Sequence, residues 1–313
     1  MHNFDLQAHR GGRMIRPENT LAAFEYAIRL GVSTLELDMH VTADNVVVLS
    51  HNPVLSWYLA RDEQGQWIKP GYEPVIYAMP FAEVRRYNVG GVNPDCTAYW
   101  KQYGQYQQAV DRETIPTLAE VFSLVQQYGA DSIRFNIETK CYPNHPEWSP
   151  LPEEFCRSVL AVVDEFDMQE RVMVQSFDWR TLTAMKRLNP AITCVALTDD
   201  ECRQADAAGL SPWLAGLQLT DYSNSIVTAA KAAGADILSP QYQDVNDKMM
   251  AEAQAIHMPV IPWTVNNRCD MNKLISLGVA GLISDHPALL REVMAERNMP
   301  LPPAYVLKNI GRV

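Results

Sequence analysis

Strand-like and helix-like segments alternate along most of this 313-residue chain. Apolar runs typical of buried strands end at His9 and recur at 35–41, 133–138, 172–175, 192–197, 236–239, 260–265 and 281–284. Helical periodicity separates most of these runs, at 19–30, 154–166, 179–188, 226–233, 248–256 and 271–277. Strict alternation favours a parallel sheet, and eight repeats predict a closed α/β barrel of the TIM type. We expect residues 1–313 to form this one domain, with a further apolar run at 217–220 as part of a long connection.

Residues 52–114 interrupt the alternation, because they show no clear periodicity. The segment nevertheless carries seven of the 13 tyrosines and three of the 7 tryptophans. A structureless loop of this length is uncommon inside a compact domain, so the segment is expected to form a small packed cap rich in aromatic side chains. It leaves the barrel directly after His51, at the end of the second strand. We therefore expect the cap to begin at the active face and to shape the substrate pocket.

Acidic side chains stand at the ends of two predicted strands. Glu36 and Asp38 are one residue apart on a strand, so their side chains share a face, and Glu138 ends the next core strand. Because strand ends meet on one face of a barrel, three carboxylates would converge there, and buried acids are costly without a cation among them. The pattern predicts one divalent cation, Mg²⁺ or Ca²⁺, held by these three residues. The alternative is a structural salt bridge, for instance from Glu138 to Arg10 or Lys140.

Two histidines at strand ends are the candidates for proton transfer. His9 and His51 titrate near neutral pH, and cleavage of a phosphodiester needs one group to activate the attacking oxygen and another to protonate the leaving oxygen. A hydrogen-bonded structural role is the alternative for each. His40 and His286 are left out, since His40 is placed on the face opposite to Asp38 and His286 belongs to a terminal turn.

Basic and polar residues complete the predicted site. Arg10 and Lys140 are candidates to hold phosphate oxygens, with neutralisation of the neighbouring acids as the alternative. Gln175 and Trp263 also stand at strand ends, and a core role is the alternative for Trp263. The residues Glu18, Asn19 and Thr20 are expected to cap the helix at 19–30.

Three short motifs resemble those of the glycerophosphodiester phosphodiesterase family. They are HRG at 9–11, PENT at 17–20 and ELD at 36–38, and the similarity runs to about Pro287 with a gap at 52–114. The resemblance implies a TIM barrel and a divalent metal that together hydrolyse glycerophosphodiesters to glycerol 3-phosphate and an alcohol. It also implies that Gln175 and Trp263 line the pocket and that an insertion follows His51. The family usually has Asp after its second histidine, where this chain has Asn52.

The sequence therefore predicts a metal-dependent glycerophosphodiester phosphodiesterase, with His9 and His51 as the general acid and base in an unassigned order. Water and the glycerol 2-hydroxyl both fit as the attacking nucleophile. One alternative is a barrel related to phospholipases C and D that acts on phospholipid or lysophospholipid head groups. Another is a barrel that binds phosphodiesters without catalysis, although a binding protein has no need of both histidines and all three acids.

Composition excludes several classes of partner. The formal net charge of −11 repels nucleic acid and anionic bilayers. The sequence lacks a run of about 20 apolar residues, so no membrane span is predicted. The six cysteines are scattered without a CxxC pair and the first residues do not read as an export signal, which favours a cytoplasmic protein. An exported chain whose signal peptide has been removed is the alternative. The expected partner is a small-molecule substrate, and a homo-oligomer is left open.

Overall fold

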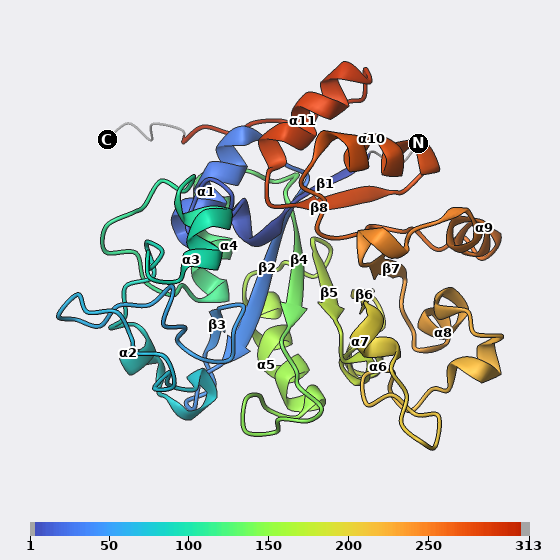
Figure 1. Cartoon of the computed structure of the whole chain (residues 1–313), viewed down its shortest axis with the longest axis horizontal. Helices are drawn as coiled ribbons and strands as arrows, with labels where there is room; N and C mark the ends of the chain where they lie inside the picture. Colours follow the sequence, from blue (N-terminus) through green and yellow to red (C-terminus); the bar gives the residue numbers. More distant parts are fainter. Residues whose placement is uncertain (1–3, 308–313) are drawn as a thin grey trace.

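Seven parallel strands form the centre of the molecule. The computed structural model describes residues 4–307 (Figure 1). The strands are β1 (Asp5–Ala8), β2 (Thr34–Val41), β4 (Arg134–Thr139), β5 (Val172–Ser176), β6 (Thr193–Thr198), β7 (Ile237–Pro240) and β8 (Gly281–Ser284). Neighbouring strands follow the order β7-β6-β5-β4-β2-β1-β8. All seven were predicted, with bounds that differ by a few residues at most.

Residues 260–265, the remaining predicted strand, lie between β7 and β8 without forming a regular strand. The amide of Ile261 donates to the carbonyl of Leu238 at 2.9 Å, and the amide of Ile283 donates to the carbonyl of Pro262 at 3.0 Å. Backbone hydrogen bonds on both sides thus join the two edges of the sheet and close it into a barrel. The predicted α/β barrel of the TIM type is confirmed.

Helices alternate with the strands around the barrel. The longer ones are α1 (Leu21–Leu30), α4 (Leu118–Gln127), α5 (Pro152–Glu165), α6 (Trp179–Leu188), α8 (Ile226–Ala232), α9 (Asp247–Ala255), α10 (Arg268–Leu277) and α11 (Pro287–Glu296). Six of these match the predicted stretches, whereas α4 and α11 were not predicted. Residues 217–220 form no strand, and a 3₁₀ turn at Leu219–Tyr222 occupies this part of a long connection, as expected. None of the helices within residues 4–307 is both long and apolar enough to cross a membrane.

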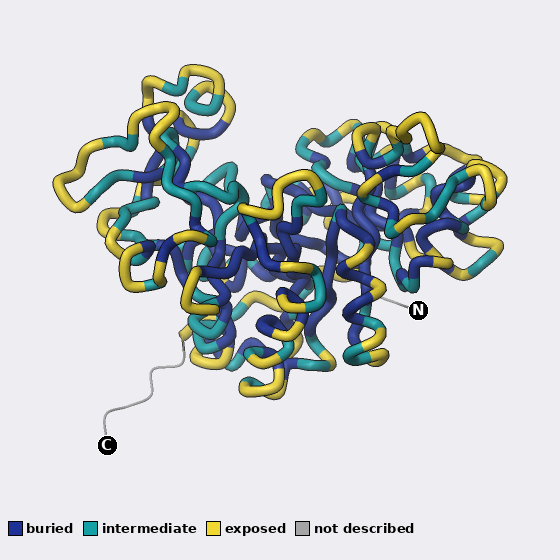
Figure 2. The backbone as a smooth tube through the Cα atoms, turned by 90° about the horizontal axis from the view of Figure 1, so that it is seen from below, coloured by how far each residue is buried: buried dark blue, intermediate teal, exposed yellow. Residues whose placement is uncertain are grey.

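Buried apolar side chains fill the layer between the strands and the helices, and Figure 2 shows buried residues concentrated at the centre of the molecule. Alternate residues of β2 point to opposite faces, so Leu35 and Leu37 join this apolar core while Glu36 and Asp38 face inward.

The barrel interior contains a continuous chain of amide side chains. Asn136 donates to Gln7 at 2.8 Å and to Gln175 at 3.0 Å. Gln175 in turn donates to Glu36 at 2.6 Å, and Gln7 donates to Asp5 at 3.0 Å. Each of these side chains is buried, so the hydrogen bonds satisfy polar groups that would otherwise be costly in the interior, although Asn136 Oδ1 accepts no hydrogen bond within the described residues. The chain leads from the first residue of β1 up to the acids of β2.

Residues 52–114 leave the barrel after β3 (Val47–Leu49), a short strand that pairs antiparallel with β2 and was not predicted. The segment contains the short helices α2 (Phe81–Val84) and α3 (Thr97–Tyr99), the latter continued by a π-helical turn to Gly104. It has a hydrophobic cluster of its own, made by Leu55, Ala60, Ile76, Met79 and Val84 together with Val48 and Ile115. Apolar burial, as well as backbone bridges, therefore orders the segment.

Candidate active site

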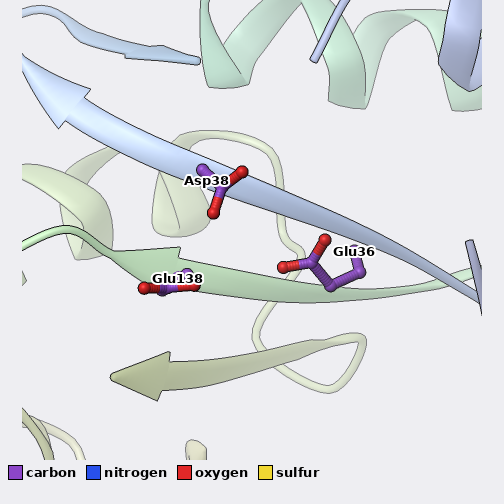
Figure 3. A group of neighbouring side chains, drawn as sticks. All are labelled: Glu36, Asp38 and Glu138. Atoms are coloured by element: carbon purple, nitrogen blue, oxygen red, sulfur yellow. The ribbon is translucent and has the colours of Figure 1, made fainter. Parts of the chain in front are cut away.

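Three carboxylates meet where β2 and β4 run side by side. The register of the two strands places Asp38 opposite Glu138, and Glu36 lies two residues before Asp38 on the same face. One oxygen of each carboxylate lies within 4.8 Å of the others, and all three side chains are buried. Figure 3 shows Glu36 and Asp38 extending from β2 beside Glu138 of β4. The structure thus brings together the three residues that the sequence predicts as metal ligands.

Two cations lie against these acids. The Nζ of Lys140 is 3.1 Å from Asp38 Oδ1 and 2.7 Å from Glu138 Oε1, and the Nε of Arg10 is 3.2 Å from Asp38 Oδ2. The ion pair between Glu138 and Lys140, which the sequence offered as the alternative to a metal site, is therefore present. Among residues 4–307, the donors to the oxygens of Glu36 are neutral, namely the side-chain amide of Gln175 and the backbone amide of Arg10.

The pKa values show that the positive charge is distributed unevenly. Burial opposes the ionised form of Asp38, but Lys140 and Arg10 together outweigh it and hold the pKa of Asp38 well below its usual range. Burial raises the pKa of Glu36 well above its ordinary value, and the charges of Asp38 and Glu138 raise it further. Burial also raises the pKa of Glu138, to about 7, against the opposing charge of Lys140.

This donor set fits a divalent cation. Burial raises the pKa of Glu36 and that of Glu138, in the case of Glu138 despite the charge of Lys140. A bound divalent cation would supply the further positive charge that favours both ionised carboxylates. Asp38 Oδ1 accepts no well-aligned hydrogen bond within the described chain, which leaves a lone pair free for a ligand bond. Hard oxygen donors of this kind suit Mg²⁺ or Ca²⁺.

His9 is oriented by Asp285, a residue that the sequence analysis did not single out. His9 Nδ1 lies 2.6 Å from Asp285 Oδ1, and Asp285 also accepts hydrogen bonds from Arg13, Asn266 and Tyr103. With Nδ1 donating to a carboxylate, Nε2 of His9 is the free acceptor, 3.9 Å from Glu36. Burial lowers the pKa of His9 to about 4, an effect that Asp285 opposes. The position of Asp285 directly after β8 was the signal that could have identified it.

Asn52 orients His51. Its Nδ2 donates to Ser56 Oγ and to the hydroxyl of Tyr58, both at 2.6 Å, so its Oδ1 is turned toward His51 Nδ1 at 2.8 Å. The amide can only accept from the ring, which keeps the proton on Nδ1 and leaves Nε2 free. Burial lowers the pKa of His51 well below its usual range, and Arg10 and Lys140 lower it further.

The PENT motif corrects one prediction. Thr20 caps α1 by accepting a hydrogen bond from the amide of Ala23, as expected. Asn19 instead donates to Asp38 Oδ2 at 2.8 Å and accepts from the Asp38 amide at 3.2 Å. Glu18 accepts from Arg10 at 2.9 Å. The prediction that Glu18 and Asn19 act as caps is therefore wrong, because their side chains turn back to the site.

Close packing fixes the turn that carries His9 and Arg10. Gly11 has a φ of +81°, and a Cβ at this position would lie 2.7 Å from the side chain of Ala23 in α1. Only glycine is accommodated here, since any other residue would combine a strained backbone with a clash. The turn thereby holds the backbone amide of Arg10 against Glu36, 2.9 Å from Oε2.

His40 lies behind the site rather than away from it. Its Nε2 is 3.4 Å from the carbonyl oxygen of His51, and its ring is stacked with that of Tyr142. The expectation that placed His40 opposite to Asp38 is wrong, because residues two apart on a strand share a face. His286 caps α11, because its Nδ1 accepts a hydrogen bond from the amide of Leu289 at 3.1 Å.

One central cavity of about 100 Å³ collects the predicted residues. Its walls include every residue predicted for the site except Asp38, namely His9, Arg10, Glu36, His51, Glu138, Lys140, Gln175 and Trp263. The ring of Trp263 is held by a hydrogen bond to Ser239 and packs edge-on against Phe177.

No residue of 52–114 lines this cavity. The segment contacts the site by hydrogen bonds instead, from Tyr99 to Glu18 and from Tyr103 to Asp285.

Comparison with known proteins identifies relatives of this chain. Residues 9–289 match the model of the glycerophosphoryl diester phosphodiesterase family. The chain belongs to this family. A glycerophosphodiester phosphodiesterase of Caldanaerobacter subterraneus subsp. tengcongensis is 26% identical over 90% of this chain and 94% of its own.

Solved structures of the glycerophosphoryl diester phosphodiesterase family have the same fold. A crystal structure from Silicibacter pomeroyi DSS-3 that bears the family name is 29% identical, with a TM-score of 0.83 over 95% of each chain. A phosphodiesterase of Oleispira antarctica, solved with sn-glycerol-3-phosphate, is 23% identical and superimposes with a TM-score of 0.67 over 93% of this chain and 96% of its own. Family membership confirms that the chain is an enzyme, a phosphoric diester hydrolase.

Proposed function

We propose that this enzyme hydrolyses glycerophosphodiesters to glycerol 3-phosphate and an alcohol, with a divalent cation held by Glu36, Asp38 and Glu138. The arrangement that carries the proposal is the meeting of these buried acids with two histidines, each with its own Nδ1 partner, around one cavity. The Oleispira antarctica phosphodiesterase, whose fold is similar, was solved with the product sn-glycerol-3-phosphate.

In this proposal the substrate phosphate binds among the cations of the site. When bound, the divalent cation supplies positive charge to the phosphate and lowers the pKa of the attacking hydroxyl group. Arg10 presents a planar guanidinium beside Asp38, and Lys140 presents a point charge between Asp38 and Glu138. Both cations are fixed by their acids before substrate arrives, which lowers the cost of orienting the phosphate.

The partners of the two histidines divide their roles. His9 donates to the Asp285 carboxylate, whose negative charge stabilises the imidazolium that forms when Nε2 accepts a proton, so His9 suits the general base. His51 donates to the neutral amide of Asn52, which stabilises an imidazolium less, so protonated His51 gives up its proton more readily. The entering phosphate anion favours the protonated form of His51, which then protonates the leaving alcohol.

Phosphorus NMR tests this function directly. The protein, loaded with Mg²⁺ or Ca²⁺, is incubated with a panel of glycerophosphodiesters and lysophospholipids, and the phosphorus product is identified. We expect glycerol 3-phosphate from the glycerophosphodiesters and no turnover after exhaustive chelation. A phosphorylated alcohol as the product, or turnover of lysophospholipids alone, would overturn the proposal.

A further inference from the structure

A second cavity, called the side cavity below, opens beside the central one. It has a volume of about 420 Å³ and lies where the chain leaves β4, β5 and β6. It shares His51, Glu138, Lys140 and Phe177 with the central cavity, so a molecule whose phosphate lies at those residues can extend into both. The central cavity, at about 100 Å³, leaves room for only one small arm of a phosphodiester.

Aromatic rings make much of the wall of the side cavity. Tyr142 and Trp148 come from the connection after β4, Phe177 follows β5, and Trp213 comes from the connection after β6. Trp148 packs edge-on against Tyr142, with ring centroids 5.2 Å apart, and Phe177 packs edge-on against Trp263. Within residues 4–307 no guanidinium group stacks on these rings. The imidazole of His145 covers one face of Trp148, with ring centroids 3.8 Å apart, and that of His40 stacks on Tyr142, so Trp148 has its other face left for a ligand.

The charge of the side cavity is negative. Asp199 and Glu201 line it at the start of α7 (Asp200–Arg203), and neither forms an ion pair in the part of the chain that is described. The nearby Arg203 pairs with Asp200 and Asp244 instead. Lys140, the lysine in the wall, is already bound by Asp38 and Glu138. Aromatic rings beside carboxylates that lack a cationic partner are the combination that recognises organic cations.

We propose that the side cavity binds the alcohol portion of the substrate and selects alcohols that carry an ammonium group, quaternary or primary. This inference rests on the proposed function. An anionic head group would be repelled by Asp199 and Glu201, and a fatty acyl chain would desolvate these two carboxylates without compensation. A neutral polyol would fit and donate hydrogen bonds to the carboxylates, but it would form neither an ion pair nor a cation–π contact. A cationic head group gains from both.

The test compares kcat/KM for glycerophosphocholine, glycerophosphoethanolamine and glycerophosphoglycerol, whose alcohols are a quaternary ammonium, a primary ammonium and a neutral polyol. We expect the two cationic substrates to exceed the neutral one by about 3- to 30-fold, the range for a partly exposed cation–π site. The preference should shrink as salt is added, because the carboxylates are not deeply buried. Equal kcat/KM for all three substrates would overturn the inference while leaving the proposed function intact. No turnover of any of them would overturn both.

Variants locate the preference in the side cavity. The double variant Asp199→Asn, Glu201→Gln removes both charges while Asn still accepts the helix-capping hydrogen bond from the amide of Cys202. Its ratio of cationic to neutral kcat/KM should fall toward one. The control is Asp200→Asn, which removes an adjacent exposed charge that does not line the cavity, and it should keep the wild-type ratio.

A second variant, Trp148→Leu, should lower the same ratio through the loss of a ring face. Thermal unfolding of each variant shows that it is folded. An unchanged ratio in both the double variant and Trp148→Leu would overturn the assignment of the side cavity to the ammonium group.

Discussion

The partners of His9 and His51 decide the roles that the two rings can play. A base at His9 is supported by a buried carboxylate, and an acid at His51 by a neutral amide, although both rings have the same chemistry. The difference comes from the residue that accepts the hydrogen bond from each Nδ1. It can be tested by comparing rates for substrates with different leaving groups and by measuring the pH dependence of the rate.

If His51 protonates the leaving alcohol, its removal matters in proportion to how basic that oxygen is. His51→Ala should slow hydrolysis of an alkyl glycerophosphodiester by about 10²–10⁴-fold. A nitrophenyl phosphodiester, whose leaving group departs unaided, should lose far less rate. His9→Ala should slow both substrates similarly. Equal losses for His51→Ala would refute the assignment, and a selective loss with His9→Ala would reverse the roles.

Asn52→Asp places a carboxylate beside His51. A negative partner favours the imidazolium, so the pKa of His51 should rise and the pH optimum of kcat/KM for an alkyl substrate should move upward. The hydroxyls of Ser56 and Tyr58 can donate to the new carboxylate, which keeps the side chain in place. Asn52→Ala serves as the control, because it frees the ring and should lower the rate without the upward shift. An optimum that stays in place in Asn52→Asp would show that Asn52 does not set the charge of His51.

Some residues of the site could be predicted from the sequence, and others could not. Strand ends and the family motifs were enough to bring His9, Glu36 and Glu138 together, because the barrel gathers strand ends whatever lies between them. Asp285 also follows a strand, but it lies in a turn with His286 and no motif distinguishes the two residues from the sequence. The role of Asn19 could not be predicted, since it depends on the positive φ of 54° that turns its side chain toward Asp38.

At the scale of elements, residues 52–114 act on the site through hydrogen bonds to its acids. Tyr103 donates to Asp285 at 3.2 Å, and its ring lies 4.4 Å from the guanidinium carbon of Arg13, which also binds Asp285. Tyr99 donates to Glu18, the partner of Arg10. The segment thus braces the carboxylates that orient His9 and Arg10, although it lines neither the central nor the side cavity.

Tyr103→Phe should therefore reduce kcat more than it changes KM. The lost hydrogen bond is worth about 1 kcal/mol, so the reduction should be roughly fivefold. With less of its charge neutralised, Asp285 should raise the pKa of His9, and the pH optimum should shift upward. Tyr106→Phe is the matched control, because Tyr106 lies in the same segment but is 58% exposed. Equal effects of the two variants, or a change in KM alone, would contradict this role.

Elements were predicted well where apolar periodicity is long or the strand is flanked by turns. The helix α6 was predicted with its observed bounds, since its apolar face repeats over ten residues. The strand β3 spans only three residues and merges with the segment that follows, so its pattern is too short to read. Residues 260–265 close the barrel through hydrogen bonds on both sides without regular strand geometry, which no local pattern could specify.

At the scale of the whole molecule, the acids of the site link folding to pH and to metal. The pKa of Glu36 and that of Glu138 are raised on folding, to about 7 for Glu138 from an ordinary value of 4.5. The stability that they contribute is therefore fully present below pH 4.5 and is lost as the pH rises through the folded values. A bound cation replaces the missing protons, so it should stabilise the protein more at pH 8 than at pH 5.5.

Thermal unfolding with and without Mg²⁺ or Ca²⁺ at the two pH values measures this linkage. At pH 8, a cation at one hundred times its Kd should add about 2.7 kcal/mol to the free energy of unfolding. Glu138→Gln should weaken cation binding and reduce the loss of stability between pH 5.5 and pH 8 in the absence of cation. The control Glu147→Gln, at an exposed acid, should behave as the wild type. A cation effect of the same size at both pH values in the wild type would contradict the linkage.

The amide chain inside the barrel has a direction. Asn136 donates both ways, so the two glutamines must turn their carbonyl oxygens inward to it and their amide groups outward, to Asp5 below and Glu36 above. Rotating either glutamine amide by half a turn would set donor against donor at Asn136, and rotating Asn136 would set acceptor against acceptor. Only a concerted reversal of all three would avoid this, and it would turn the glutamine oxygens toward the carboxylates at both ends. A change at Gln7 is thus felt by Glu36 through two intervening side chains. Substitutions at Gln7, Asn136 and Gln175 should therefore be tolerated as matched sets rather than one at a time.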